Sequence, residues 1–81
     1  MIEINLSTAQ EFRLRMEYVN SNYYQLATIN GKYGAKYSYK NFVLDTVYGV
    51  IAVHTEDSPE YIYRLTFRDK ESLVLFTLKY S

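Results

Sequence analysis

His54 is the one histidine of the chain and the residue best suited to acid–base chemistry, because histidine alone changes charge near neutral pH without help. Nucleophilic catalysis needs such a base beside a serine or cysteine, and a zinc site needs three or four ligands. The chain has no cysteine and no second histidine to complete either set. We therefore interpret His54 as a partly exposed residue at the end of a strand, and we predict that the protein is not an enzyme.

Two other groups of residues are of types found in ligand sites. Glu56, Asp57 and Glu60 form an acidic stretch, but they lack the alternating spacing of a calcium-binding loop. Gly31 and Gly34 precede a strand-like segment, whereas a phosphate-binding loop needs clustered glycines that lead into a helix. The sequence therefore predicts no metal and no cofactor.

Residues 31–40 interleave basic and aromatic side chains, as does a platform on which single-stranded nucleic acid stacks. A hairpin folded at Asn30-Gly31 would place Lys32 and Lys36 on the face opposite to most of the tyrosines, which separates the charges from the rings. The nine basic residues are balanced by nine acidic ones, so overall charge would not hold the chain to nucleic acid. A single-stranded nucleic-acid-binding sheet is therefore the alternative function.

Aromatic residues favour a protein-binding role instead. Ten of the 81 residues are tyrosines, which combine a large contact area with little loss of side-chain entropy. In a helix over residues 8–20, Leu14 and Tyr18 lie four apart, away from the predicted core stripe, and form either an exposed pair or a second covered side. The predicted partner-binding residues are Leu14, Tyr18, Tyr23, Gln25, Lys32, Lys36 and Lys40.

The N-terminal residues predict a strand and then a helix. Residues 1–6 alternate apolar and polar side chains. Ser7 with Gln10, and Thr8 with Glu11, both have the spacing of a capping box, so we expect a helix over residues 8–20. Residues 11–18 also alternate, which leaves a strand as the alternative. The core stripe of the helix would consist of Ala9, Phe12, Met16 and Val19.

The remainder of the chain predicts strands. Asn30-Gly31 is the preferred dipeptide of a two-residue hairpin turn, so residues 23–39 are expected to form a hairpin. The apolar run 42–54 predicts a central strand, interrupted near Asp45 or Gly49.

Residues 61–80 predict a second hairpin, with its loop near Lys70. An even-numbered loop would place eight side chains on one sheet face, with Leu65 and Phe76 central to the core. The full set is Tyr61, Tyr63, Leu65, Phe67, Val74, Phe76, Leu78 and Tyr80.

These elements predict an α+β fold, an antiparallel sheet of about five to six strands with one N-terminal helix packed on a face. An all-β meander or small barrel is the alternative. The chain shows no linker or repeat, so residues 1–81 are expected to form a single domain. No apolar run approaches the roughly 18 residues of a membrane span, so we expect a cytoplasmic protein with no membrane partner.

In its small size, lack of cysteine and richness in aromatic residues, the chain resembles proteins that phages and other mobile elements make to block host machinery, anti-CRISPR proteins among them. The resemblance covers composition and no motif, and it implies an inhibitor of a protein or nucleoprotein. We therefore predict a small protein–protein interaction module that binds, and can inhibit, a larger macromolecular partner. A homodimer is the alternative to binding a different partner.

Overall fold

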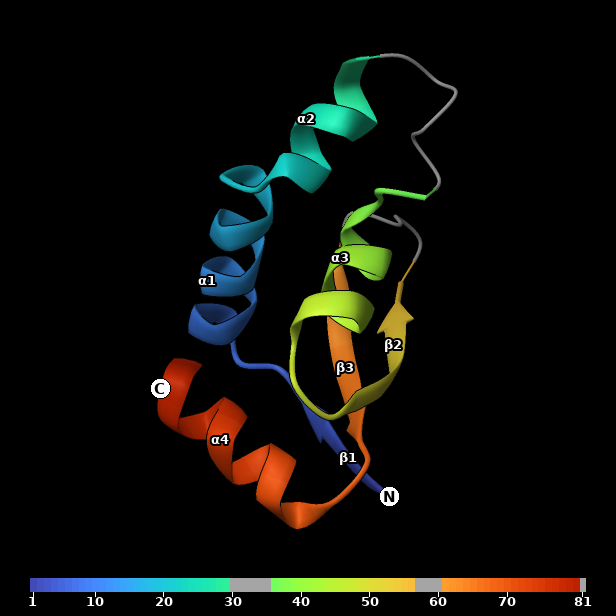
Figure 1. The fold of residues 1–81 in the computed structure, drawn as a ribbon. Coiled ribbons are helices and arrows are strands. Elements are labelled where there is room, and N and C mark those ends of the chain that lie inside the picture. Colours follow the sequence, from blue (N-terminus) through green and yellow to red (C-terminus); the bar gives the residue numbers. More distant parts are fainter. Residues whose placement is uncertain (30–35, 57–60, 81) are drawn as a thin grey trace.

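The structure, a computed structural model, describes residues 1–29, 36–56 and 61–80. Within these ranges the chain forms three strands and four helices. Their bounds are β1 (Ile2–Asn5), α1 (Thr8–Val19), α2 (Asn22–Ile29), α3 (Tyr39–Thr46), β2 (Val50–Thr55), β3 (Ile62–Phe67) and α4 (Lys70–Tyr80) (Figure 1). The predicted α+β class is correct. The predicted five to six strands with a single helix, and the all-β alternative, are wrong.

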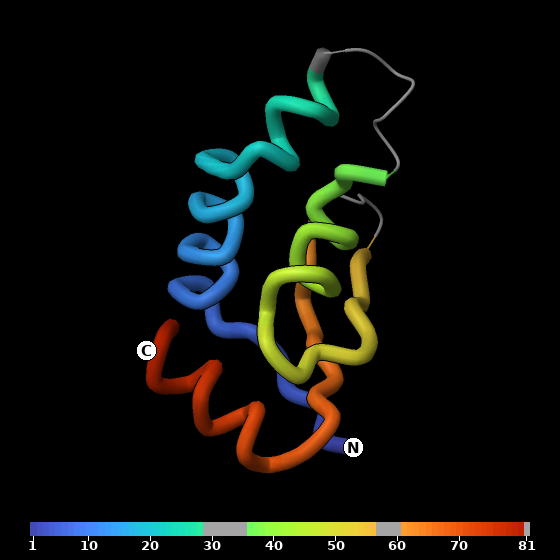
Figure 2. The backbone as a smooth tube through the Cα atoms, viewed as in Figure 1, coloured from blue at the N-terminus to red at the C-terminus, as the bar shows by residue number. Residues whose placement is uncertain are grey.

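The three strands form one antiparallel sheet in the order β1-β3-β2. Ile2 lies opposite Phe67 and Ile4 opposite Leu65, while Val53 meets Leu65 from the other side. Residues directly opposite each other point to the same side of a sheet, so these five apolar side chains share one face. β3 is the central strand, so β1 joins the sheet only through its pairing with β3, and the two segments lie side by side although they are at opposite ends of the chain (Figure 2).

The core lies between that face and the helices. Figure 1 shows α3 lying across the sheet, with α1 and α2 to one side and α4 close to the beginning of α1. Helices α1, α3 and α4, and both longer strands, contribute fully or almost fully buried apolar side chains. These are Leu14, Tyr39, Phe42, Val43, Val50, Val53, Ile62, Leu65, Phe67, Phe76 and Tyr80.

The N-terminal predictions of a strand and a helix are confirmed. Ser7 caps α1, because its hydroxyl accepts from the Gln10 amide at 3.1 Å and the Gln10 side chain accepts from the Ser7 amide at 3.0 Å. This capping box satisfies two of the amides that a helix start leaves without a partner. The alternative, a strand over residues 11–18, is wrong.

The predicted hairpin around Asn30-Gly31 is wrong in its first arm, because residues 22–29 form α2. The Asn30-Gly31 turn itself lies outside the described residues. In α2 the ring of Tyr23 packs edge-on against Phe42 at 5.5 Å, and its hydroxyl donates to Asp45 at 2.9 Å. Short helices gain most of their stability from such tertiary packing, which a local turn signal does not report.

The apolar run 42–54 is divided between a helix and a strand. Ser38 starts α3, because its hydroxyl accepts from the backbone amide of Asn41 at 3.3 Å. The chain then turns at Gly49, whose φ of 81° lies in the region that glycine adopts most readily, and continues as β2. The predicted interruption near Gly49 is therefore present, but the part before it is helical.

The C-terminal prediction holds for its first half. β3 is the predicted strand, whereas the predicted second arm is helix α4. Asp69 opens this helix by accepting from the amide of Ser72 at 2.9 Å and from its hydroxyl at 2.8 Å. Leu65 and Phe76 are both buried, as predicted. The prediction that all eight side chains share one sheet face is wrong, because residues 70–80 form a helix, which turns Leu78 outward.

Candidate interaction surface

The two sides of α1 have the opposite roles to those that the sequence predicts. Leu14, expected to lie away from the core, has no exposed surface, and Tyr18 is half-buried. The predicted core stripe faces solvent instead, with Phe12 61%, Met16 43% and Val19 39% exposed. We call these three residues the α1 stripe.

Aromatic neighbours fix the orientation of α1. The ring of Tyr18 lies 5.2 Å from that of Tyr39, 5.5 Å from that of Phe42 and 5.6 Å from that of Tyr24, so it joins α1 to α2 and α3. Its hydroxyl donates to the carbonyl oxygen of Tyr37 at 3.1 Å. Aromatic pairs at such distances add to the stability gained from area burial alone. This cluster holds Leu14 inward and leaves the α1 stripe outside.

A buried carboxylate supports the same side of α1. Glu11 is almost fully buried and accepts from Arg15 at 3.1 Å and from the Tyr39 hydroxyl at 3.3 Å. A buried charge is tolerated when it is paired and hydrogen-bonded in this way. Burial, with the nearby Glu11 carboxylate as the second cause, raises the pKa of Tyr39 above its ordinary value of 10.0. Tyr39 therefore stays a neutral donor.

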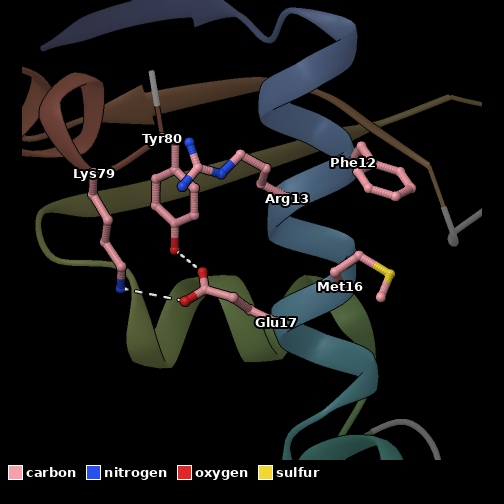
Figure 3. A pocket seen from close by; sticks show the side chains of 6 residues that line it. All are labelled: Phe12, Arg13, Met16, Glu17, Lys79 and Tyr80. Carbon is pink, nitrogen blue, oxygen red and sulfur yellow. Dashed lines mark hydrogen bonds and ion pairs between the residues drawn. The ribbon is translucent and has the colours of Figure 1, made fainter.

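The α1 stripe borders a junction between α1 and α4. The Tyr80 hydroxyl donates to one carboxylate oxygen of Glu17, and the Lys79 ammonium lies 3.5 Å from the other. Figure 3 shows Arg13 and Glu17 extending toward Lys79 and Tyr80, while Phe12 and Met16 lie on the other side of α1. These six residues line a shallow pocket of about 270 Å³.

A second apolar surface lies on α4. Val74, Leu75 and Leu78 are exposed, Leu78 to 73%. We call these residues the α4 patch. Leu75 and Tyr48 border a smaller pocket of about 130 Å³. Lys79 and Tyr80 line both pockets, but no residue of the α1 stripe lines the smaller pocket and no residue of the α4 patch lines the larger one.

The predicted partner-binding residues are only partly brought together. Leu14 offers no surface to a partner, while Tyr18 and Tyr23 both pack against Phe42. Gln25 is exposed on α2.

Two of the three predicted partner-binding lysines, Lys36 and Lys40, lie outside the sheet. Lys36 and Lys40 are exposed, Lys36 with its ammonium over the ring of Tyr37 at 5.5 Å. Lys32 lies outside the described residues. Residues 36–40 lead into and begin α3, so this part of the predicted nucleic-acid platform belongs to no sheet.

Polar side chains surround Arg64 on the sheet face opposite the helices. Arg64 stands opposite Asn5 on one side and His54 on the other, and its guanidinium lies 3.6 Å from Glu3. His54 shares a hydrogen bond of 3.2 Å with the Thr66 hydroxyl. His54 is half-buried within β2, near its end, as its sequence position indicates.

Among residues 1–29, 36–56 and 61–80, no group of three or more acidic or histidine side chains is placed to hold a metal ion. None of the helices in this described part of the chain combines the length and apolarity that crossing a membrane requires.

Comparison with known proteins gives no family. No protein-family model matches the sequence, and no similar curated protein or solved structure is found.

Proposed function

We propose that this protein is an interaction module that binds a larger protein through the α1 stripe. The observation that carries the proposal is the row of Phe12, Met16 and Val19 facing solvent along one side of α1. Single exposed apolar residues are common on protein surfaces, but aligned groups of large ones are typical of binding sites. Phe and Met are also enriched in protein–protein interfaces.

The arrangement of the stripe supports a binding role over a structural one. Leu14 and Tyr18 already supply the core contacts of α1, so the fold does not need Phe12 or Met16 for that purpose. The pocket of about 270 Å³ beside these two residues gives a partner side chain a place to enter. Clustered anchors in hollows of this kind supply most of the binding energy of an interface.

The α1 stripe is a better candidate than the α4 patch. Its residues extend along the helix in line, and its pocket is about twice as large as the one beside Leu75. The α4 patch is confined to little more than one helical turn. It serves best as the matched control, because it carries comparable apolar residues on a neighbouring helix.

Inhibition of the partner remains a prediction from the resemblance in composition. The absence of enzymatic activity remains a prediction from the lack of residues that could complete a catalytic set with His54. A partner bound at the α1 stripe would have the corresponding part of its own surface covered. This mode of action requires no catalytic group.

Capture by matched variants tests the proposal. The parent chain, a Phe12→Ser/Met16→Ser variant and a Leu75→Ser/Leu78→Ser variant are immobilised and exposed to extract of cells that express the protein. Circular dichroism and thermal melts first establish that all three are folded. We expect a partner that the parent and the α4 variant retain and the α1 variant loses.

Cross-linking from within the stripe supplies the second readout. A photoreactive residue at position 16 should label the same partner, whereas one at Thr28, exposed on α2, should not. A partner that binds all three chains equally, or that is labelled only from Thr28, would remove the α1 stripe as the site.

A further inference from the structure

Helix α4 carries apolar side chains on both its inner and its outer side. The inner side contributes the buried Phe76 and Tyr80 to the core, while the α4 patch of Val74, Leu75 and Leu78 is exposed on the outer side. A helix with apolar residues all round is typical of a position that is covered on both sides. Figures 1 and 2 show α4 at the periphery of the molecule, so its outer side is accessible to another chain.

Opposite charges stand at the two ends of the α4 patch. Glu71, Leu75 and Lys79 follow one another at intervals of four residues, so they are neighbours along the surface of the helix. All three are exposed. This row is therefore negative at its N-terminal end, apolar in the middle and positive at its C-terminal end, with Leu75 midway between the two charges.

Both charged side chains can reach a chain that covers the patch. No ion pair within the described residues involves Glu71. The Lys79 ammonium lies 3.5 Å from Glu17, but this pair is exposed, and an ammonium has three N–H donors on a flexible stem. Lys79 also lines the pocket beside Leu75, so its side chain borders the α4 patch as well as α1.

The row is complementary to a second copy of itself in one orientation. In an antiparallel pair of α4 helices centred on Leu75, position 71 of each copy stands opposite position 79 of the other. The two-fold symmetry of such a pair then gives two contacts between Glu71 and Lys79. In a parallel pair Glu71 would face Glu71 and Lys79 would face Lys79, and like charges across an interface select against that arrangement.

Tyr48 widens the apolar surface beside α4. Its ring is 58% exposed and lines the pocket of about 130 Å³ together with Leu75. Arg68 donates to the Tyr48 hydroxyl at 3.0 Å, which holds the ring near the start of α4. Even so, one helix of 11 residues and a turn make a smaller surface than the roughly 20–30 residues a side of a standard interface. We therefore expect a contact that dissociates on dilution.

We propose that the outer side of α4 binds α4 of a second copy of this chain in an antiparallel arrangement, with Leu75 at the two-fold axis and Glu71 paired with Lys79 of the other copy. The inference goes beyond the proposed function, because it assigns a second surface to a different occupant. The α1 stripe takes no part in this contact. A dimer of this kind presents two α1 stripes, which increases the apparent affinity for a partner that can engage both.

Sedimentation equilibrium of the full chain over a concentration series tests for the dimer. The parent should be dimeric at high concentration and monomeric after dilution. Leu75→Ser/Leu78→Ser should stay monomeric, whereas Phe12→Ser/Met16→Ser should dimerise like the parent, and circular dichroism first establishes that both variants are folded. A parent that stays monomeric up to about 1 mM would overturn the inference. So would a dimer that Phe12→Ser/Met16→Ser abolishes or that Leu75→Ser/Leu78→Ser leaves unchanged.

Charge reversal tests the orientation. Glu71→Lys and Lys79→Glu each place like charges opposite one another, so each variant alone should dimerise at least about tenfold more weakly than the parent at low salt. Mixed in equal amounts, the two variants should form a heterodimer, because both contacts then join opposite charges. Parent-like dimerisation of Glu71→Lys alone, or no gain on mixing two folded variants, would overturn the antiparallel pairing. The result for Glu71→Lys stands by itself if Lys79→Glu does not fold.

The outcome is separable from that of the proposed function. Capture of a larger protein is read from the effect of Phe12→Ser/Met16→Ser on the bound partner, whereas the dimer is read from the mass of the purified chain. If the chain is monomeric and capture still depends on Phe12 and Met16, the interaction module stands and the dimer does not. If the dimer forms and no partner is captured, the reverse holds.

Discussion

Gly49 and Ser72 are in direct contact, which joins the turn before β2 to the first turn of α4. A Cβ atom added at Gly49 would overlap the Cβ and Oγ atoms of Ser72. Ser72 has no exposed surface, and its hydroxyl is held by Asp69. Neither residue can therefore move aside easily.

Replacing Gly49 with alanine should strongly destabilise the protein. The φ of 81° costs a non-glycine residue about 1–3 kcal/mol, and the overlap with Ser72 adds a packing penalty of similar size. Urea unfolding followed by circular dichroism measures the loss. The double variant Gly49→Ala/Ser72→Gly, which removes the overlap but keeps the backbone strain, should recover part of the stability. A parent-like melting curve for Gly49→Ala would contradict the contact.

Alanine substitutions at Leu14 and Phe12 should have very different effects, although the residues are two positions apart. Leu14→Ala should lower the free energy of unfolding by about 2–5 kcal/mol, because Leu14 is fully buried. Phe12→Ala should change it by about 0.5 kcal/mol or less, because Phe12 is largely exposed. Thermal melts of the two variants side by side check the orientation of α1. The reverse ranking would restore the orientation that the sequence predicts.

Removing the carboxylate of Glu11 should loosen the contact between α1 and α3. Glu11→Ala takes away the acceptor shared by Arg15 and the Tyr39 hydroxyl, and we expect a loss of about 1–3 kcal/mol. Glu11→Gln keeps an acceptor and should lose less. Glu3→Gln serves as control, because its contact with Arg64 is exposed and should be worth about 1 kcal/mol at most. Equal effects of Glu11→Ala and Glu3→Gln in urea would show that the buried cluster does not stabilise the fold.

Stability should fall at alkaline pH because of two buried phenols. Burial is the main cause that raises the pKa values of Tyr39 and Tyr80 above the ordinary 10.0, with Glu11 and Glu17 as the next contributors. Their contribution is fully present below the unfolded-state pKa of about 10 and is lost as the pH rises above it. In thermal melts between about pH 9 and 11, Tyr39→Phe/Tyr80→Phe should lose less stability than the parent. If stability declined identically in the parent and in the double variant, the two tyrosines would not be the cause of the decline.

Asp69 should make the free energy of unfolding fall at acid pH, the opposite pH direction to that of the two tyrosines. Hydrogen bonds from the amide and hydroxyl of Ser72 hold the pKa of Asp69 below its ordinary value of 3.8. Its contribution is present above pH 3.8 and is lost as the pH falls through the lower, folded-state value. Asp69→Asn, which cannot ionise, should show a shallower loss of stability over this range in urea titrations. A slope equal to that of the parent would mean that Asp69 is not linked to folding.

The short-range signals in the sequence identified the elements that local chemistry controls. The capping box of Ser7 and Gln10 located the start of α1, and alternation located β1 and β3. The caps Ser38 and Asp69 are equally local and could have indicated α3 and α4. The apolar run 42–54 and the alternation in 73–80 pointed to strands instead, because short apolar segments of this kind satisfy both a strand and a helix that is apolar on several sides.

The sequence analysis assigned the wrong side of α1 to the core for a different reason. α1 carries apolar side chains on two sides, and periodicity cannot say which side the rest of the chain covers. The neighbours of Tyr18 decide it, since Tyr39 and Phe42 become adjacent to α1 only when α3 packs across the sheet.

Nearby residues and strong apolarity were enough to locate the start of α1, to give the α+β class and to assign Leu65 and Phe76 to the core. That Phe12, Met16 and Val19 remain outside follows only from how the helices pack. Burial is a property of the assembled chain, and a helix with two apolar sides is oriented by the residues that meet it from far away in sequence.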